Sequence, residues 1–166
     1  MTILFAYDGS DSADAAIAAA RSLLSRQDDG SVVVSVWDPA IVEGLRATKF
    51  GAPPAIAMDA AQQDERAERH ARLLAEHGTR MANQAGFAAR ARWVAENKHV
   101  ADTILAVADE VDADVIVVGA RGLTRIAGFL GSVSVHVLQH ARRPVLIVPP
   151  GPASPATAAD DARRLA

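Results

Sequence analysis

Apolar positions along the chain follow two spacings, which separate predicted strands from predicted helices. Five short apolar or β-branched runs predict strands over residues 2–7, 31–36, 88–95, 114–118 and 145–148. Apolar residues at intervals of three and four predict helices over residues 13–25, 59–85, 100–111 and 133–141. Because strands and helices alternate, the pattern predicts an α/β fold: an open, doubly wound, Rossmann-like parallel sheet of five strands with helices on both faces. With the first strand central, we expect the strand order 3-2-1-4-5.

Three features interrupt this regular pattern. Residues 37–58 contain prolines and glycines that prevent long regular structure, yet they are rich in apolar side chains. We therefore expect either a functional flap or a surface loop packed on its own domain. Gly78 weakens the middle of the helix over 59–85, and we expect a kink or break there. Residues 150–166 are rich in Pro, Ala and Ser without apolar periodicity, so we expect a disordered tail after one domain over residues 1–149.

Composition and charge narrow the function classes. The chain has 166 residues, of which 50% are apolar, and this length fits one domain with a full core. A net charge of −3 argues against binding to nucleic acid or to an anionic membrane surface. The absence of cysteine excludes disulfides and thiolate chemistry. Because no signal peptide and no apolar stretch of about 20 residues is evident, we expect a soluble cytoplasmic protein.

A glycine-rich stretch after the fourth predicted strand carries the chemistry that points to a ligand. Residues 119–134 read GARGLTRIAGFLGSVS, between a β-branched run and a helix start. Glycines let a ligand approach the backbone, and the free amides of a helix N-terminus attract phosphate. Arg121 and Arg125 add positive charge, and the hydroxyls of Ser132 and Ser134 add donors, with Ser132 the expected N-cap of the last helix. The alternative is a plain strand-to-helix turn with solvated arginines.

A second polar turn, Asp8-Gly9-Ser10, follows the first predicted strand. In doubly wound sheets, ligands bind at the carboxyl ends of the strands where the strand order reverses. The turns after strands one and four flank that crevice, so a topological rule and a local motif indicate the same nucleotide site. Asp8 has the alternative role of capping the first helix.

Four stretches together carry a resemblance to a known family, at residues 3–10, 115–122, 131–134 and 143–149. Over residues 1–149 the chain resembles the universal stress protein family. The ATP-binding branch of that family carries G-x-x-G, nine residues and then G-[S/T]. Gly119, Gly122 and Gly131 match this pattern, but only eight residues lie between the second and third of them. The loop is one residue shorter than the pattern, and we expect Gly128 to absorb the change because glycine accepts positive φ.

The resemblance implies a role for each matching residue. Asp8 would contact the adenosine part, and the backbone of Val36 would meet adenine. The glycines and serines of the late loop would hold the ribose and the phosphates. The full set of implied nucleotide-binding residues is Ala6, Tyr7, Asp8, Val36, Val118, Gly119, Arg121, Gly122, Gly131, Ser132, Val133 and Ser134. The implied ligand is ATP, or ADP or AMP, with Mg²⁺ among the phosphates, and no catalytic or metal-ligating side chain is implied. The strand over 145–148 would pair across a two-fold axis in a homodimer.

Other residues keep a plainer interpretation beside a functional one. His136 and His140 are four residues apart, as some metal pairs are, but no third ligand is evident and we expect packing or interface histidines. His70 and His77 fall on the stripe of the long helix and are expected at a core edge or an interface. Trp37 either stacks near the base or packs in the core.

Three functions follow from this pattern. The first is an ATP-binding, dimeric stress or signalling switch whose output lies in contacts with an unknown protein partner. The second, favoured by the shorter loop, is a dimeric interaction module that has lost nucleotide binding. The third is a slow ATP hydrolase. It is the least favoured because the sequence has no Walker-type Gly-Lys-[Ser/Thr] and no evident general base beside the loop.

Overall fold

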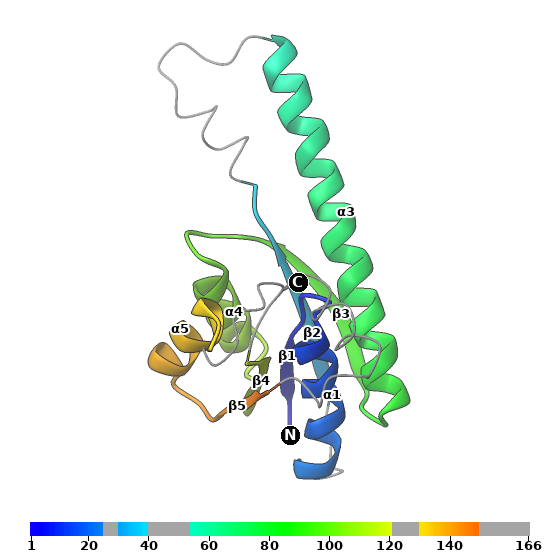
Figure 1. Cartoon of the computed structure of the whole chain (residues 1–166), viewed down its shortest axis with the longest axis vertical. Coiled ribbons are helices and arrows are strands. Elements are labelled where there is room, and N and C mark those ends of the chain that lie inside the picture. Colours follow the sequence, from blue (N-terminus) through cyan, green and yellow to red (C-terminus); the bar gives the residue numbers. More distant parts are fainter. Residues whose placement is uncertain (25–29, 40–53, 121–129, 150–166) are drawn as a thin grey trace, which may run out of the picture.

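The five strands form a single parallel sheet with the order β3-β2-β1-β4-β5 (Figure 1). The structure is a computed structural model that describes residues 1–24, 30–39, 54–120 and 130–149, with only the backbone for residues 54–60. The strands are β1 (Ile3–Ala6), β2 (Ser31–Trp37), β3 (Ala89–Ala95), β4 (Val115–Gly119) and β5 (Val145–Val148). The helices are α1 (Asp11–Leu23), α3 (Pro54–Gln84), α4 (Val100–Glu110) and α5 (Ser132–His140). The predicted fold class and strand order are therefore confirmed.

Each face of the sheet is covered by two helices because β1 is apolar on both sides. Ile3 and Phe5 are buried in a cluster with residues of α1 and α3, and the Phe5 ring meets the edge of Phe87 at a centroid distance of 5.1 Å. Leu4 is buried in a second cluster with residues of α4 and α5, including Ile104 and Val137. Alternate residues of a strand point to opposite faces, so a fully apolar run such as β1 belongs in the centre of the sheet.

The helix α3 differs from its prediction at its start and at Gly78. It begins at Pro54 rather than at 59, because the first turn of a helix tolerates a proline that lacks the N–H. It also runs through Gly78 without a break. A Cβ at Gly78 would lie 2.8 Å from Cγ of Tyr7 and 2.9 Å from Cγ1 of Val33, so this glycine lets α3 pack closely on the sheet. The N-terminal part of α3 extends beyond the sheet (Figure 1).

The structure also corrects both ends of the irregular segment that was predicted over residues 37–58. The segment over 37–58 was predicted to lack long regular structure, but Trp37 ends β2 and residues 54–58 belong to α3. Residues 40–53, where the flap or loop was predicted, lie outside the described residues, as does the tail over 150–166. The other helix and strand ends agree with their predictions to within about two residues.

Candidate functional site

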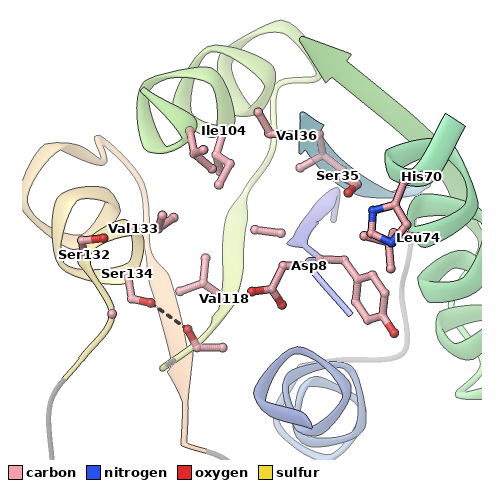
Figure 2. A pocket seen from close by; sticks show the side chains of 16 residues that line it. Asp8, Ser35, Val36, His70, Leu74, Ile104, Val118, Ser132, Val133 and Ser134 are labelled. Carbon is pink, nitrogen blue, oxygen red and sulfur yellow. Dashed lines mark hydrogen bonds between the residues drawn. The ribbon is translucent and has the colours of Figure 1, made fainter. Parts of the chain in front are cut away.

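A pocket of about 430 Å³ opens at the carboxyl ends of β1, β2 and β4 (Figure 2). Its walls come from one turn and three helices that meet at this edge: the turn after β1, the side of α3, the start of α4 and the start of α5. The described lining residues are Ala6, Tyr7, Asp8, Val34, Ser35, Val36, His70, Leu74, Val100, Ile104, Val118, Gly119, Gly131, Ser132, Val133 and Ser134. The two turns that the sequence placed at one crevice therefore lie at one pocket.

The turn after β1 presents Asp8 to this pocket. The Asp8 carboxylate accepts a hydrogen bond from the backbone N–H of Ser10 at 3.0 Å. The hydroxyl oxygen of Ser10 in turn accepts from the N–H of Ala13 at 3.2 Å, so Ser10, and not Asp8, is the N-cap of α1. Gly9 has a φ of +76°, which a side chain would strain, and it lies directly under Leu74 of α3. The Asp8 carboxylate points toward Val118 across the base of the pocket (Figure 2).

Tyr7 also lines the pocket, but its hydroxyl is held by α1. The phenol donates a hydrogen bond to the Asp14 carboxylate at 2.7 Å. Burial, together with the negative charge of Asp14, raises the pKa of Tyr7 well above its ordinary value, so the phenol stays protonated. Tyr7 therefore contributes ring surface to the pocket wall.

The end of β4 makes close backbone contacts with the start of α1. A Cβ at Gly119 would lie 2.7 Å from the carbonyl carbon of Ser12 and 2.9 Å from the backbone N of Ala13. The Gly119 carbonyl oxygen accepts a hydrogen bond from the Ser134 hydroxyl at 2.7 Å. One residue further, the Gly131 N–H donates to the carbonyl oxygen of Ala120 at 2.7 Å. These bonds hold the start of α5 against the end of β4, with only residues 121–129 of the connection outside the described part.

The N-terminus of α5 faces the pocket with its first backbone amides. Gly131 is the N-cap of this helix and makes no side-chain cap bond, so the prediction that Ser132 is the N-cap is wrong. Ser132, Val133 and Ser134 are the first helical residues, and their N–H groups have no acceptor inside the helix. Amides of this kind attract an anion, assisted by the helix dipole. The Ser134 hydroxyl already has Gly119 as its acceptor, so the backbone N–H is the donor that Ser134 offers to a ligand.

Comparison with known proteins identifies the family. The sequence model described as "Universal stress protein family" matches residues 1–149. The chain belongs to this family. A search of curated protein sequences found no match.

Solved structures with the same fold agree with that assignment. A universal stress protein family member from Burkholderia pseudomallei is 29% identical, with a TM-score of 0.58, over 90% of this chain and 96% of that one. A universal stress protein in complex with cAMP is 26% identical, with a TM-score of 0.61, over 91% and 98% of the two chains. A family member from Arabidopsis thaliana with AMP bound is 21% identical, with a TM-score of 0.59, over 94% and 98%.

Most of the residues that the family resemblance singled out lie together in this universal stress protein. Ten of the twelve line the pocket, and the remaining two, Arg121 and Gly122, lie outside the described residues together with Arg125. Trp37 ends β2 and is not among the described lining residues.

Sequence reasoning missed six lining residues. They are Val34 and Ser35 of β2, His70 and Leu74 of α3, and Val100 and Ile104 of α4. The topological rule could have found the residues at the end of β2 and the start of α4, because both lie at the carboxyl edge of the sheet. Nothing in the local sequence places α3 over the turn after β1. That contact depends on how the helix packs.

Of the two histidines of α5, His136 contacts α4 and His140 contacts His136. Nε2 of His136 lies 2.9 Å from a carboxylate oxygen of Asp102, and the rings of His136 and His140 stack at a centroid distance of 4.1 Å. Within the described residues, no group of three or more His, Cys, Asp or Glu side chains could hold a metal ion. In the same residues, no helix is long and apolar enough to cross a membrane.

Proposed function

We propose that this universal stress protein binds ATP, or alternatively ADP or AMP, in the pocket at the carboxyl edge of its sheet. We further propose that it acts as a cytoplasmic homodimer and a stress-response switch whose output lies in contacts with another protein. One observation carries the nucleotide proposal: the pocket joins an apolar wall at one end to the first backbone amides of α5, which have no acceptor inside the helix, at the other. A purine nucleotide has this same division between an apolar base and an anionic phosphate chain.

The two ends of the pocket suggest how the nucleotide would lie. Val36, Val100 and Ile104 would pack against adenine, and the Val36 backbone would meet its polar edge. Asp8 would accept hydrogen bonds from the sugar. The amides of residues 132–134 would hold phosphate oxygens. The relatives in complex with cAMP and with AMP support an adenine nucleotide as the ligand class.

Mg²⁺ would join the site mainly through the phosphates of the nucleotide. The described residues contain no cluster of three possible ligands, and Mg²⁺ usually keeps several waters and takes only one or two carboxylates from the protein. Asp8 is the carboxylate that lines the described part of the pocket. We therefore propose that Mg²⁺ accompanies ATP and adds little to the binding of AMP.

Calorimetric titration of the purified protein tests the nucleotide proposal. We expect saturable binding of ATP and AMP, and a rise in melting temperature at millimolar nucleotide that GTP does not match. An absence of binding to both adenine nucleotides would overturn the proposal. Mass spectrometry of nucleotide released from freshly purified protein would name the species that the protein holds in the cell.

The alternative function is a dimeric interaction module without nucleotide. The observation that favours it is the late loop, which is one residue shorter than the ATP-binding pattern. The same titration separates the two, because the module would form the dimer without binding nucleotide.

We propose a binding role rather than a catalytic one. Asp8, the carboxylate in the described pocket, accepts a hydrogen bond from the backbone N–H of Ser10, and no second acidic side chain is among the described lining residues. Slow ATP hydrolysis remains the less favoured alternative. A turnover above roughly 1 per second, an ordinary enzyme rate, would contradict the binding role.

The dimer would form through β5. This strand lies at one edge of the sheet, with β4 as its neighbour, and Val145, Leu146 and Ile147 are only partly buried. An apolar edge strand needs a cover, and a second copy paired across a two-fold axis supplies one.

A further inference from the structure

The helix α3 packs against the turn after β1 through residues spaced four apart. Gly78 lies against the Tyr7 ring, where an added Cβ would be 2.8 Å from Cγ. One turn earlier, Leu74 lies over Gly9, where an added Cβ would be 2.7 Å from Cδ2 of Leu74. Residues four apart share one face of a helix, so His70 comes next on this same face. Because Gly78 and Leu74 pack closely on Tyr7 and Gly9, they fix the position of His70 relative to the turn after β1.

His70 lines the pocket from the side opposite α5. In Figure 2 its ring stands beside Leu74 and near the end of β2 at Ser35, across the pocket from Ser132 and Ser134. The phosphate end of the proposed ligand belongs at the amides of α5. His70 therefore lies at the end of the pocket where the nucleoside would lie.

We propose that His70 contacts the nucleoside part of the bound nucleotide and contributes to its affinity, an inference that rests on the proposed function. The imidazole offers a ring face, a donor and an acceptor to a base or a ribose. Tyr7 is the other aromatic ring among the described lining residues, but it is buried and its hydroxyl donates to Asp14. His70 is exposed, so its ring is accessible to a ligand. Through His70, α3 becomes a third binding element beside the turn after β1 and the start of α5.

Comparison of adenosine with AMP tests this assignment. A nucleoside contact contributes equally to both ligands, whereas a phosphate contact contributes only to AMP. We expect His70→Ala to weaken binding of adenosine and of AMP by the same factor, roughly three- to tenfold, which is the effect of losing about one net hydrogen bond or ring contact. The ratio of the two affinities should stay at its wild-type value.

His77→Ala is the matched control. His77 lies on the same helix and is also exposed, with its ring 6.1 Å from that of Tyr7, but it is not among the described pocket-lining residues. We expect His77→Ala to bind both ligands as the wild type does. Both variants should keep the wild-type melting temperature within a few degrees, because each removes an exposed side chain.

A direct measurement complements the variants. In protein labelled at histidine, the Cε1–Hε1 signal of His70 should shift on addition of adenosine, while the signal of His77 should shift much less. Equal affinities of His70→Ala and wild type for adenosine would overturn the inference. A loss confined to AMP would also overturn it, because it would place the ring at the phosphate. A wild-type protein that binds neither ligand would instead refute the proposed function itself.

Discussion

The Ser134 hydroxyl donates a hydrogen bond to the Gly119 carbonyl oxygen at 2.7 Å, and this bond joins the first turn of α5 to the last residue of β4. It orients the amides of α5 toward the pocket without using a ligand. Ser134 is buried, so the bond is shielded from water. The structural role of this hydroxyl was not part of the sequence-based expectation, which assigned it to phosphate.

Ser134→Ala should affect both stability and binding. The change leaves the Gly119 carbonyl without its partner, so we expect a loss of about 1–2 kcal/mol in the free energy of unfolding. We expect nucleotide affinity to fall several-fold because the amides are less firmly oriented. Ser132→Ala is the control: Ser132 is exposed at the first position of α5, and its loss should leave stability within about 0.5 kcal/mol. Urea unfolding and calorimetry on both variants would check this, and equal stability losses would contradict it.

Two glycines of the same region should respond differently to substitution. Gly119→Ala places a Cβ 2.7 Å from the backbone of Ser12, so we expect about 1–3 kcal/mol of destabilisation. Gly131 has φ −64° and ψ 151°, which a β-branched residue adopts readily. Gly131→Val should therefore keep the fold and the proposed dimer, while its side chain blocks the amides and abolishes the proposed binding of ATP. Gly131→Val with wild-type affinity would show that the phosphates lie elsewhere.

Arg143 ties the chain before β5 to the C-terminal end of α4. Its guanidinium donates to the carbonyl oxygen of Ala108 at 3.0 Å, to the carbonyl oxygen of Ala113 and to the Asp109 carboxylate. A cation at this end also interacts favourably with the helix dipole. We expect Arg143→Ala to destabilise the fold by about 2 kcal/mol, because the Ala113 carbonyl and the Asp109 carboxylate lose the guanidinium as donor and the Ala108 carbonyl keeps only the bond from the Ala113 N–H. Asp109→Ala removes only the ion pair with Arg143, in which the Asp109 side chain is exposed. We expect it to lower the free energy of unfolding in urea by less than about 1 kcal/mol.

Tyr7 predicts an alkaline limit to stability. Its folded-state pKa is raised by burial and by Asp14, so the stability that it contributes is fully present below the unfolded pKa of about 10 and is lost as pH rises through the folded pKa. Tyr7→Phe should cost about 1 kcal/mol at pH 7, where the hydrogen bond to Asp14 is lost, and should unfold with a weaker dependence on pH above 10. The chain has one tyrosine, so phenolate absorbance during alkaline titration reports this residue alone. Parallel alkaline unfolding curves of variant and wild type would count against this interpretation.

Leu146→Asp tests the proposed dimer through β5. A carboxylate on a half-buried edge strand should repel its symmetry mate and remain solvated only in a monomer. Sedimentation velocity should therefore show monomers, with circular dichroism verifying that the fold is retained. Trp93→Ser on β3, at the other edge of the sheet, is the control and should leave the dimer intact. A dimer that survives Leu146→Asp would exclude this interface.

The order of the elements could be predicted because each one carries a local signal. Val115–Val118 has no polar face to expose, and β1 is apolar at consecutive positions, so both had to be central strands. The alternation of Arg90 and Arg92 with Ala91 and Trp93 likewise indicated an edge, where β3 lies. Helix ends were less well predicted. Pro54 is tolerated at more than one position of a first turn, and Ser132 could be an N-cap or a first helical residue. Only the surrounding contacts decide where each helix begins.

The amino-acid sequence by itself determined the parallel sheet, its strand order and the two turns that meet at the pocket, because apolar periodicity and the positions of glycines are local properties of the chain. The tertiary structure alone decided that Gly78 permits close packing rather than a helix break, that Ser134 bonds to Gly119, and that α3 brings His70 to the pocket. These relationships join residues that are distant in the sequence. They depend on how side chains fit when a helix packs on a sheet, and no periodicity within one segment encodes that fit.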